Sequence, residues 1–328
     1  MVERVLARSL AAVAVWIAAA LLGAVPAAGE TPTPRDVVYY NSEATPLARI
    51  GDADYTHVML SFLTVPEDGG RAALALVTPA PLSTQLGDVP ALKRAGKRVM
   101  ASFGGGAMTA KSWARVAGRE EEVARLLAGF VERHGLDVVG IDFEISEALH
   151  RGAGHRPFDG GGMLVALTRH LRAALPTAAL ISHAPQPPYL DPRWQGGPYL
   201  DILRQAGGDI DWIAVQYYNN RGYDGPASVH VVGGAEKPFV TSVAGLAKGV
   251  AGLVWPPEKT VVGKPIYRDD ASSGHLPPAR VRDEILKPLV ARYGSRFGGL
   301  MGWQYSDLTA DHRYWNTRMA PGLLRPAR

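Results

Sequence analysis

The sequence predicts an α/β fold, a single (β/α)8 TIM barrel, and three observations support this prediction. Short apolar runs recur along the chain, amphipathic stretches separate them, and both fit within residues 36–328. Strands that alternate with helices form parallel βαβ units, and eight such units close into a barrel of ordinary size. A doubly wound open sheet is the alternative, but no G-x-G-x-x-G follows the first apolar run.

The start of the sequence has the pattern of a secretory signal peptide. Two arginines precede a continuous apolar run at residues 10–25, and small residues follow that run. A membrane anchor is the alternative, but the run is shorter than the roughly 20 residues that a spanning helix needs. We therefore expect a signal peptide at 1–28, a linker at 29–35 and a folded domain at 36–328. The mature protein is expected to be secreted, with no membrane association.

Each expected strand is a short run of mainly apolar residues. The eight runs are residues 36–40, 56–63, 97–105, 136–144, 178–185, 211–219, 260–267 and 298–306. Helix-like stretches lie between them at 110–135, 161–176 and 277–294, and each closes on Gly or Pro. The glycine-rich segment 219–237 is expected to form a long loop after the sixth strand.

Charge and composition argue against several classes of function. The net charge is +4, and no run of five or more like charges occurs, which argues against nucleic-acid binding. The chain has no cysteine, which excludes thiol catalysis, Cys-zinc sites and iron–sulfur chemistry. Because neither metal-ligand spacing nor a phosphate-binding loop is present, we expect no metal and no cofactor. We also expect a monomer.

Two acids interrupt the apolar fourth run, "LDVVGIDFEIS", at residues 136–146. A strand alternates faces with period two, so Gly140, Asp142 and Glu144 share one face, opposite an apolar face that helices would cover. Both acids should therefore point into the barrel, near the C-terminal mouth where barrel enzymes place active sites. Two carboxylates this close cannot easily both ionise, so one pKa should rise and supply a general acid. A buried salt-bridged pair is the alternative, although no base lies nearby in sequence.

With these residues, the chain resembles glycoside hydrolase family 18, the chitinases and endo-β-N-acetylglucosaminidases. The family's signature D-x-x-D-x-D-x-E is matched by Asp137, Asp142 and Glu144, while Gly140 stands where a further acid is usual. This resemblance implies a catalytic domain at 36–328 with its catalytic acids at the C-terminal end of the fourth strand.

Three further motifs follow the family's order along the chain. "ASFGGG" at 101–106 resembles the S-x-G-G motif of the third strand. "VQYYNN" at 215–220 resembles the Gln-aromatic-Tyr-Asn motif of the sixth strand, and "MGWQYSD" at 301–307 resembles the Trp-bearing eighth strand. Four motifs at four strand ends are more specific than any one of them.

The resemblance implies a role for each matched residue. Glu144 would be the general acid and then the general base, and Asp142 and Tyr218 would hold the substrate's 2-acetamido group. Alternation favours Tyr218 over Tyr217 as the inward tyrosine. The residues expected to bind substrate are Gln216, Asn219, Trp303, Ser102, Gly104 and Asp137.

The expected substrate is a glycan that contains N-acetylglucosamine. In this family the substrate's own acetamide oxygen attacks the anomeric carbon, so a sugar without that group would lack the nucleophile. The leading expectation is cleavage of β-1,4 bonds in chitin or chitooligosaccharides. The alternatives are an endo-β-N-acetylglucosaminidase acting on N-glycans and a chitinase-like protein that binds sugars without hydrolysis.

Gly140 is the departure from the family pattern. It is expected to leave a space, filled by water or by another side chain, and to give Asp142 one fewer charged neighbour. The expected consequence is retained hydrolysis that is slowed or has a shifted pH optimum.

Overall fold

The computed structural model describes residues 34–41, 45–68, 74–152, 154, 156–234 and 236–319. The expected signal peptide and most of the expected linker lie outside the described residues. Within them, eight parallel strands pair in sequence order into one closed barrel. The expected fold class is therefore confirmed.

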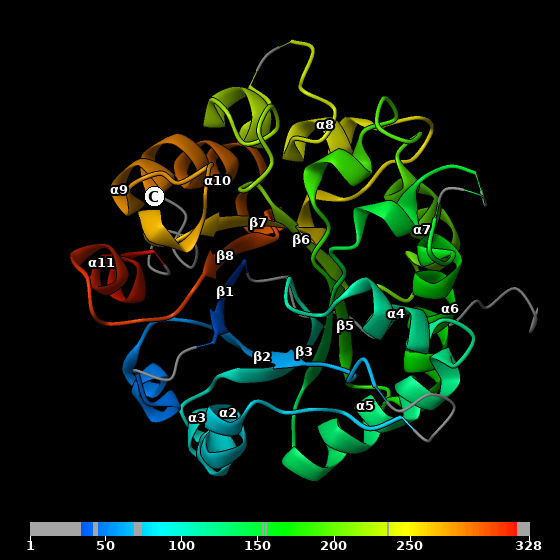
Figure 1. Cartoon of the computed structure of the whole chain (residues 1–328). Coiled ribbons are helices and arrows are strands. Elements are labelled where there is room, and N and C mark those ends of the chain that lie inside the picture. The colour runs from blue at the N-terminus through cyan, green and yellow to red at the C-terminus, as the bar shows by residue number, and fades with distance from the viewer. Residues whose placement is uncertain are drawn as a thin grey trace, which may run out of the picture. The chain divides into compact units, whose positions relative to one another are not determined.

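The strands surround a central axis, and the helices lie outside them (Figure 1). Their bounds are β1 (Arg35–Tyr40), β2 (His57–Leu63), β3 (Arg98–Gly104), β4 (Val138–Asp142), β5 (Leu180–His183), β6 (Trp212–Gln216), β7 (Thr260–Pro265) and β8 (Gly299–Trp303). All eight coincide with expected runs, but several end earlier than the apolar pattern does. For example, β4 pairs with the short strand β5 only as far as Ile141, so Glu144 lies on the loop beyond the ladder.

The helices differ from the expected stretches mainly by interruptions. Those that the structure describes are α2 (Ala80–Gln85), α3 (Val89–Arg94), α4 (Ala110–Val116), α5 (Glu120–His134), α6 (Gly160–Ala174), α7 (Pro198–Ala206), α8 (Val243–Lys248), α9 (Pro278–Val281), α10 (Lys287–Tyr293) and α11 (Ala310–Arg318). The stretch 110–135 forms two helices because Gly118 adopts a left-handed conformation, with φ of 79°. A π-helical turn at Arg282–Leu286 separates α9 from α10. The expected loop 219–237 contains a similar turn at Ser228–Val232.

Local capping explains where the two helices that flank β4 begin and end. The side chain of Asp159 accepts a hydrogen bond from Gly162 N at the start of α6. Gly135 ends α5 in the left-handed region, with φ of 62°, where a residue with a Cβ would be strained. Both signals are visible in the sequence.

Two apolar layers hold the barrel together. The outer layer packs alternate strand residues, such as Ile141 and Val215, against the helices. The inner layer fills the barrel with Val37, Tyr39, Met59, Met100, Val138, Trp212, Ala214, Tyr218, Val261 and Met301. Inward and outward residues alternate as a period-two strand requires.

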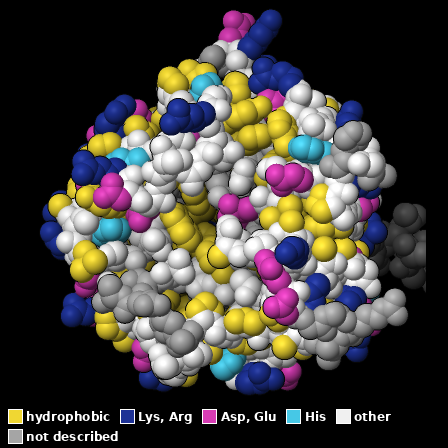
Figure 2. All heavy atoms as spheres, in the orientation of Figure 1, with side chains coloured by type: hydrophobic (Ala, Val, Ile, Leu, Met, Phe, Trp, Pro, Cys, Tyr) yellow, Lys and Arg dark blue, Asp and Glu magenta, His cyan; other side chains and the backbone are white. Residues whose placement is uncertain are grey.

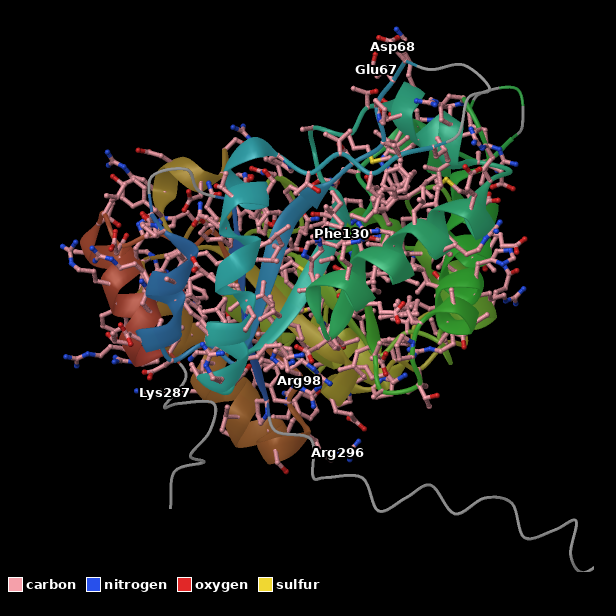
Figure 3. The ribbon with its side chains drawn as sticks, turned by 90° about the horizontal axis from the view of Figure 1, so that it is seen from below. Glu67, Asp68, Arg98, Phe130, Lys287 and Arg296 are labelled. Atoms are coloured by element: carbon pink, nitrogen blue, oxygen red, sulfur yellow. The ribbon has the colours of Figure 1, made fainter. Side chains whose placement is uncertain are left out.

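The two ends of the barrel carry different functions in this fold class. Figure 3 shows Glu67 and Asp68 projecting at one end, while Arg98 and Arg296 lie at the other. Because Arg98 starts β3 and Glu67 follows β2, the end that carries Glu67 and Asp68 is the C-terminal mouth.

No helix in the described part of the chain is long and apolar enough to cross a membrane.

Candidate active site

A cavity of about 270 Å³ opens at the C-terminal mouth of the barrel. Figure 2 shows this face, hollowed at its centre, with acidic and hydrophobic side chains visible in the hollow. The cavity is lined by Phe62, Gly106, Asp142, Glu144, Gln216, Tyr218, Asn219, Asp270 and Trp303. The ends of six different strands supply these residues, which is how barrel enzymes assemble active sites.

Asp142, at the end of β4, and Glu144, on the loop after it, lie in this cavity, and glutamine side chains hold them. Gln216 Nε2 donates to Asp142 Oδ1 at 2.8 Å and to the carbonyl of Ala184 at 2.9 Å. Gln186 Nε2 lies 3.5 Å from Glu144 Oε2, which makes a long hydrogen bond. Asp142 is only 4% exposed, so its carboxyl is largely shielded from solvent.

Burial raises the pKa of both acids. For Asp142, burial and then the charge of Glu144 raise the pKa well above its usual value, while the bond from Gln216 opposes the shift. For Glu144, burial raises the pKa, and bonds from Gln216 and Gln186 oppose it. Both shifts favour the neutral forms, so the pair keeps a proton to higher pH than free carboxyls do. A general acid needs this property.

Met59 occupies the space next to Gly140. A Cβ at Gly140 would lie 2.9 Å from Met59 Sδ and 3.2 Å from Ser182 Oγ. Of the two expectations for this space, water or another side chain, the structure has a side chain. The position of the usual third acid is therefore closed by an apolar thioether.

Tyr218 and Trp303 are aromatic residues that line the cavity. Tyr218 is 5% exposed and belongs to the inner layer, whereas the hydroxyl of Tyr217 donates to the carbonyl of Thr241 in the outer layer. This arrangement confirms that Tyr218 is the inward tyrosine. The Trp303 ring packs against Tyr39 and Phe62, with centroids 5.4 and 5.8 Å away.

Asn219 lines the cavity, but its side-chain oxygen is already engaged. Asn219 has a positive φ of 56°. Its Oδ1 accepts hydrogen bonds from Ser272 N at 2.7 Å and Ser272 Oγ at 3.0 Å. The side chain thus ties the end of β6 to the loop after β7.

Three residues expected to bind substrate do not reach the cavity. Asp137 lies at the opposite end of β4, where Lys93 Nζ is 3.0 Å from one carboxylate oxygen and Val99 N donates to the other at 2.9 Å. Ser102 is fully buried beside Gly140 in the barrel. Gly104 has φ of 112°, and a Cβ there would meet the Asp142 carbonyl oxygen at 2.1 Å. The structure therefore does not bring these three residues to the cavity, and their contact with substrate stays a prediction.

The physical reason is that a match to a family motif does not determine how far from the mouth of the barrel a residue lies. Asp137 is tied to the third strand and α3, and Ser102 packs below the acids. Gly104 lets β3 approach β4 closely, and Gly105 N donates to the Asp142 carbonyl at 2.8 Å. Gly104 and Gly105 thus hold the end of β3 close to the backbone of Asp142 at the end of β4.

Phe62, Gly106 and Asp270 line the cavity and were not predicted from the sequence. Phe62 and Asp270 lie close to the C-terminal ends of expected strands, and the rule that active sites occupy those ends could have suggested them. A Cβ at Gly106 would lie 3.5 Å from Glu144 Oε2, so this glycine keeps the backbone close to the acid.

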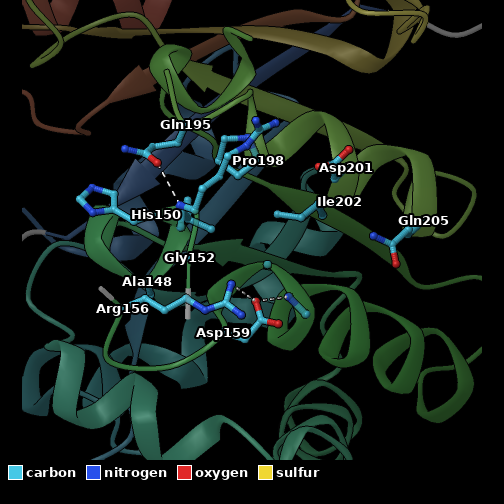
Figure 4. A pocket seen from close by; sticks show the side chains of 14 residues that line it. Ala148, His150, Gly152, Arg156, Asp159, Gln195, Pro198, Asp201, Ile202 and Gln205 are labelled. Carbon is cyan, nitrogen blue, oxygen red and sulfur yellow. Dashed lines mark hydrogen bonds and ion pairs between the residues drawn. The ribbon is translucent and has the colours of Figure 1, made fainter. Parts of the chain in front are cut away.

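A larger cavity lies outside this site. It has a volume of about 420 Å³ and lies between the loop after β4, the start of α6 and α7 (Figure 4). Its Arg156 pairs with Asp159 at 3.1 Å, and Arg151 N donates to Gln195 Oε1 at 2.9 Å. Neither Asp142 nor Glu144 lines this larger cavity. We therefore assign the candidate active site to the smaller cavity at the mouth, because that cavity contains both acids. Within the described residues, no cluster of three His, Asp or Glu side chains could hold a metal ion.

Comparisons with known proteins agree with this geometry. The sequence profile described as Glycosyl hydrolases family 18 matches residues 35–307. A chitinase structure from Pseudoalteromonas aurantia shares 30% sequence identity at a TM-score of 0.72, covering 88% of this chain and 99% of that one. The chitinase ChiC of Aspergillus fumigatus shares 26% identity at a TM-score of 0.61, covering 84% and 92% of the two chains. No curated protein sequence matches this chain.

The fold and the acid pair identify the class of protein: it is a (β/α)8 barrel of the glycosidase type. The chain belongs to glycosyl hydrolases family 18. The fold also occurs in a xylanase-A-amylase inhibitor protein, which shares 20% identity at a TM-score of 0.56 and is covered over 99% of its length, against 90% of this chain. Because one fold can serve different functions, activity has to be argued from the site.

Proposed function

We propose that this chain is a secreted glycosidase that cleaves β-1,4 bonds next to N-acetylglucosamine in chitin or chitooligosaccharides. The observation that carries the proposal is the shared cavity of Asp142, Glu144, Gln216, Tyr218 and Trp303. The two chitinase structures above support the substrate class, because they share at least 26% of their sequence with this chain.

The mechanism follows from the placement of the acids. Glu144, whose raised pKa favours the protonated form, gives its proton to the glycosidic oxygen as that bond breaks. The substrate's acetamide oxygen attacks the anomeric carbon from within the same sugar, a placement worth roughly 7–11 kcal/mol in favourable systems. Glu144 then removes a proton from water, which opens the intermediate with retention of configuration.

Asp142 and Tyr218 would hold the acetamido group during this attack. Asp142 would accept from the acetamide N–H, and the Tyr218 hydroxyl would donate to its oxygen. Gln216 fixes Asp142 through the 2.8 Å bond, so the carboxyl is oriented before substrate arrives. Trp303 would supply the apolar floor under the sugar.

Product analysis on chitooligosaccharides and on an N-glycoprotein tests the proposal. The wild type should cleave the oligosaccharides, and Glu144→Gln should lose about 10²–10⁴ of kcat because a positioned general acid contributes that much. No cleavage of either substrate would refute the hydrolase. Full activity of Glu144→Gln would refute the role of that residue.

Two alternatives remain distinguishable by the same experiment. Release of the N-glycan with intact chitooligosaccharides would assign an endo-β-N-acetylglucosaminidase. Binding of chitooligosaccharides without any cleavage would assign a sugar-binding protein. The presence of Glu144 in the cavity favours hydrolysis.

Export and a monomeric state are part of the proposal. The signal-peptide pattern at residues 1–28 supports export. N-terminal sequencing of protein recovered from culture medium, with its mass from light scattering, tests both. A chain retained in cells with residue 1 intact would contradict export.

A further inference from the structure

Asp270 is a third carboxylate in the cavity, and the proposed mechanism leaves it unused. It ends the short 3-10 helix Arg268–Asp270 that follows β7. It lines the cavity together with Glu144 and Trp303, and its side chain is 12% exposed. A charged group that is mostly buried in a cavity requires partners, and Asp270 has only some of them.

One carboxylate oxygen of Asp270 is held and the other is free. Oδ2 accepts a hydrogen bond from Tyr267 N at 2.9 Å and lies 3.6 Å from His312 Nε2. Oδ1 makes no hydrogen bond to any residue that the structure describes. The held oxygen fixes the orientation of the carboxylate, so the free oxygen is available to a ligand.

The backbone of Asp270 connects the carboxylate to the indole floor. The Trp303 Nε1 donates to the Asp270 carbonyl at 3.1 Å. In the ring of strands, β8 lies four strands from β4 by either route, so Trp303 and Glu144 come from opposite sides of the barrel. A sugar ring that rests on Trp303 would therefore have Glu144 on one side and Asp270 near the other.

We propose that Asp270 binds a hydroxyl group of the sugar ring that rests on Trp303. A sugar presents an apolar face to an aromatic ring and hydroxyl groups around its edge, and a carboxylate forms strong, charge-assisted hydrogen bonds with such groups. This inference rests on the proposed glycosidase function and adds a substrate feature to the same site. The cavity would then recognise a ring hydroxyl as well as an acetamido group.

A purely structural role for Asp270 makes a different prediction. In that case the carboxylate would only accept from Tyr267 N and stabilise the short helix. Asp270→Asn separates the two roles because the amide oxygen can still accept from Tyr267 N, while the charged acceptor facing the cavity is lost. Asp269→Asn is the matched control, since Asp269 is the adjacent acid, is 71% exposed and does not line the cavity.

The first measurement is the affinity for chitotetraose by calorimetry in the Glu144→Gln background. Adding Asp270→Asn should weaken binding by about 10- to 100-fold, and adding Asp269→Asn should change it by less than about twofold. The Tm of each variant should stay within about 2 °C of its parent. Unchanged affinity with Asp270→Asn, in a parent that binds, would overturn the inference alone. A parent and a wild type that neither bind nor cleave would overturn the proposed function and the inference together.

The second measurement uses fluorogenic chitobiosides in which one hydroxyl at a time is replaced by hydrogen. Deletion of the hydroxyl that Asp270 binds should lower kcat/KM of the wild type about tenfold or more, but should leave Asp270→Asn within about twofold of its own value. If every deletion acts equally on both proteins, Asp270 binds no ring hydroxyl.

Discussion

At the scale of single residues, the pair Gly140 and Met59 determines the surroundings of Asp142. The Met59 sulfur would lie 2.9 Å from a Cβ at position 140, so the two residues fit together only because one of them lacks a side chain. An acid introduced at position 140 alone would be forced against Met59. The single substitution Gly140→Asp would therefore mainly destabilise the fold by overpacking, and this would obscure any effect on the pKa values of Asp142 and Glu144.

The coupling between these two positions is testable by unfolding in urea. Gly140→Asp should cost about 1–3 kcal/mol through overpacking, and Met59→Ala about 2–5 kcal/mol through a cavity. The double variant should cost less than the sum by about 1–3 kcal/mol, because the aspartate then enters the vacated space. Additive costs would contradict this arrangement. In the double variant, the basic limb of the pH profile of kcat/KM should move to higher pH, since an added negative charge raises the pKa of the acid pair.

At the scale of elements, the loop after β7 supports the end of β6. Asn219 accepts two hydrogen bonds from Ser272, and Ser273 Oγ donates to Asp224 Oδ2 at 2.5 Å. The buried Lys264 Nζ donates to the Tyr217 carbonyl at 2.6 Å. The same loop carries Asp270, so its position affects both Tyr218 and the proposed hydroxyl contact.

Two glycines with similar backbone angles test the importance of this packing. A Cβ at Gly274, where φ is 81°, would lie 2.7 Å from the Tyr218 Cα, whereas a Cβ at Gly118, where φ is 79°, would meet nothing within 4 Å. Each Ala substitution carries the left-handed strain of about 1–2 kcal/mol. Gly274→Ala should also lower kcat/KM on chitooligosaccharides by about tenfold or more, while Gly118→Ala should leave it within about twofold. Equal activity of the two variants would refute the supporting role of the loop.

At the scale of the whole molecule, buried histidines limit stability in acid. Burial lowers the pKa of His183 to about 3, and burial with the nearby Arg35 and Arg98 lowers that of His57 to about 3. The His183 ring is hydrogen-bonded to Thr168 and Tyr199, so protonation would break a satisfied core contact. Because both folded pKa values lie below the ordinary value, this stability is complete above about pH 6.5 and is lost as pH falls.

Unfolding free energies at pH 7 and pH 5 measure this effect. Each buried histidine should cost up to about 1.4 kcal/mol per pH unit below its unfolded pKa, so the wild type should lose stability over this interval. His183→Gln should lose about 2 kcal/mol less between the two pH values, although it is less stable at pH 7. Equal acid sensitivity in the variant and the wild type would show that His183 does not stay neutral in the folded state.

Much of the barrel and part of the site could be predicted from the sequence. Period-two alternation correctly placed Asp142 and Tyr218 on inward faces, because alternation is a local property of a strand. The same local reasoning overestimated the lengths of strands, since pairing ends where a neighbouring strand ends. Motif matching assigned Ser102, Gly104 and Asp137 to substrate, but their depth depends on strands far away in sequence.

By itself, the sequence determined the eight strands, the inward acids and the order of the motifs, since each depends on residues close together along the chain. Only the tertiary structure decided that Met59 closes the space beside Gly140 and that Asp270 faces the cavity with a free oxygen. Contacts between strands far apart in sequence are set by closure of the barrel, and side-chain alternation within a single strand carries no information about them.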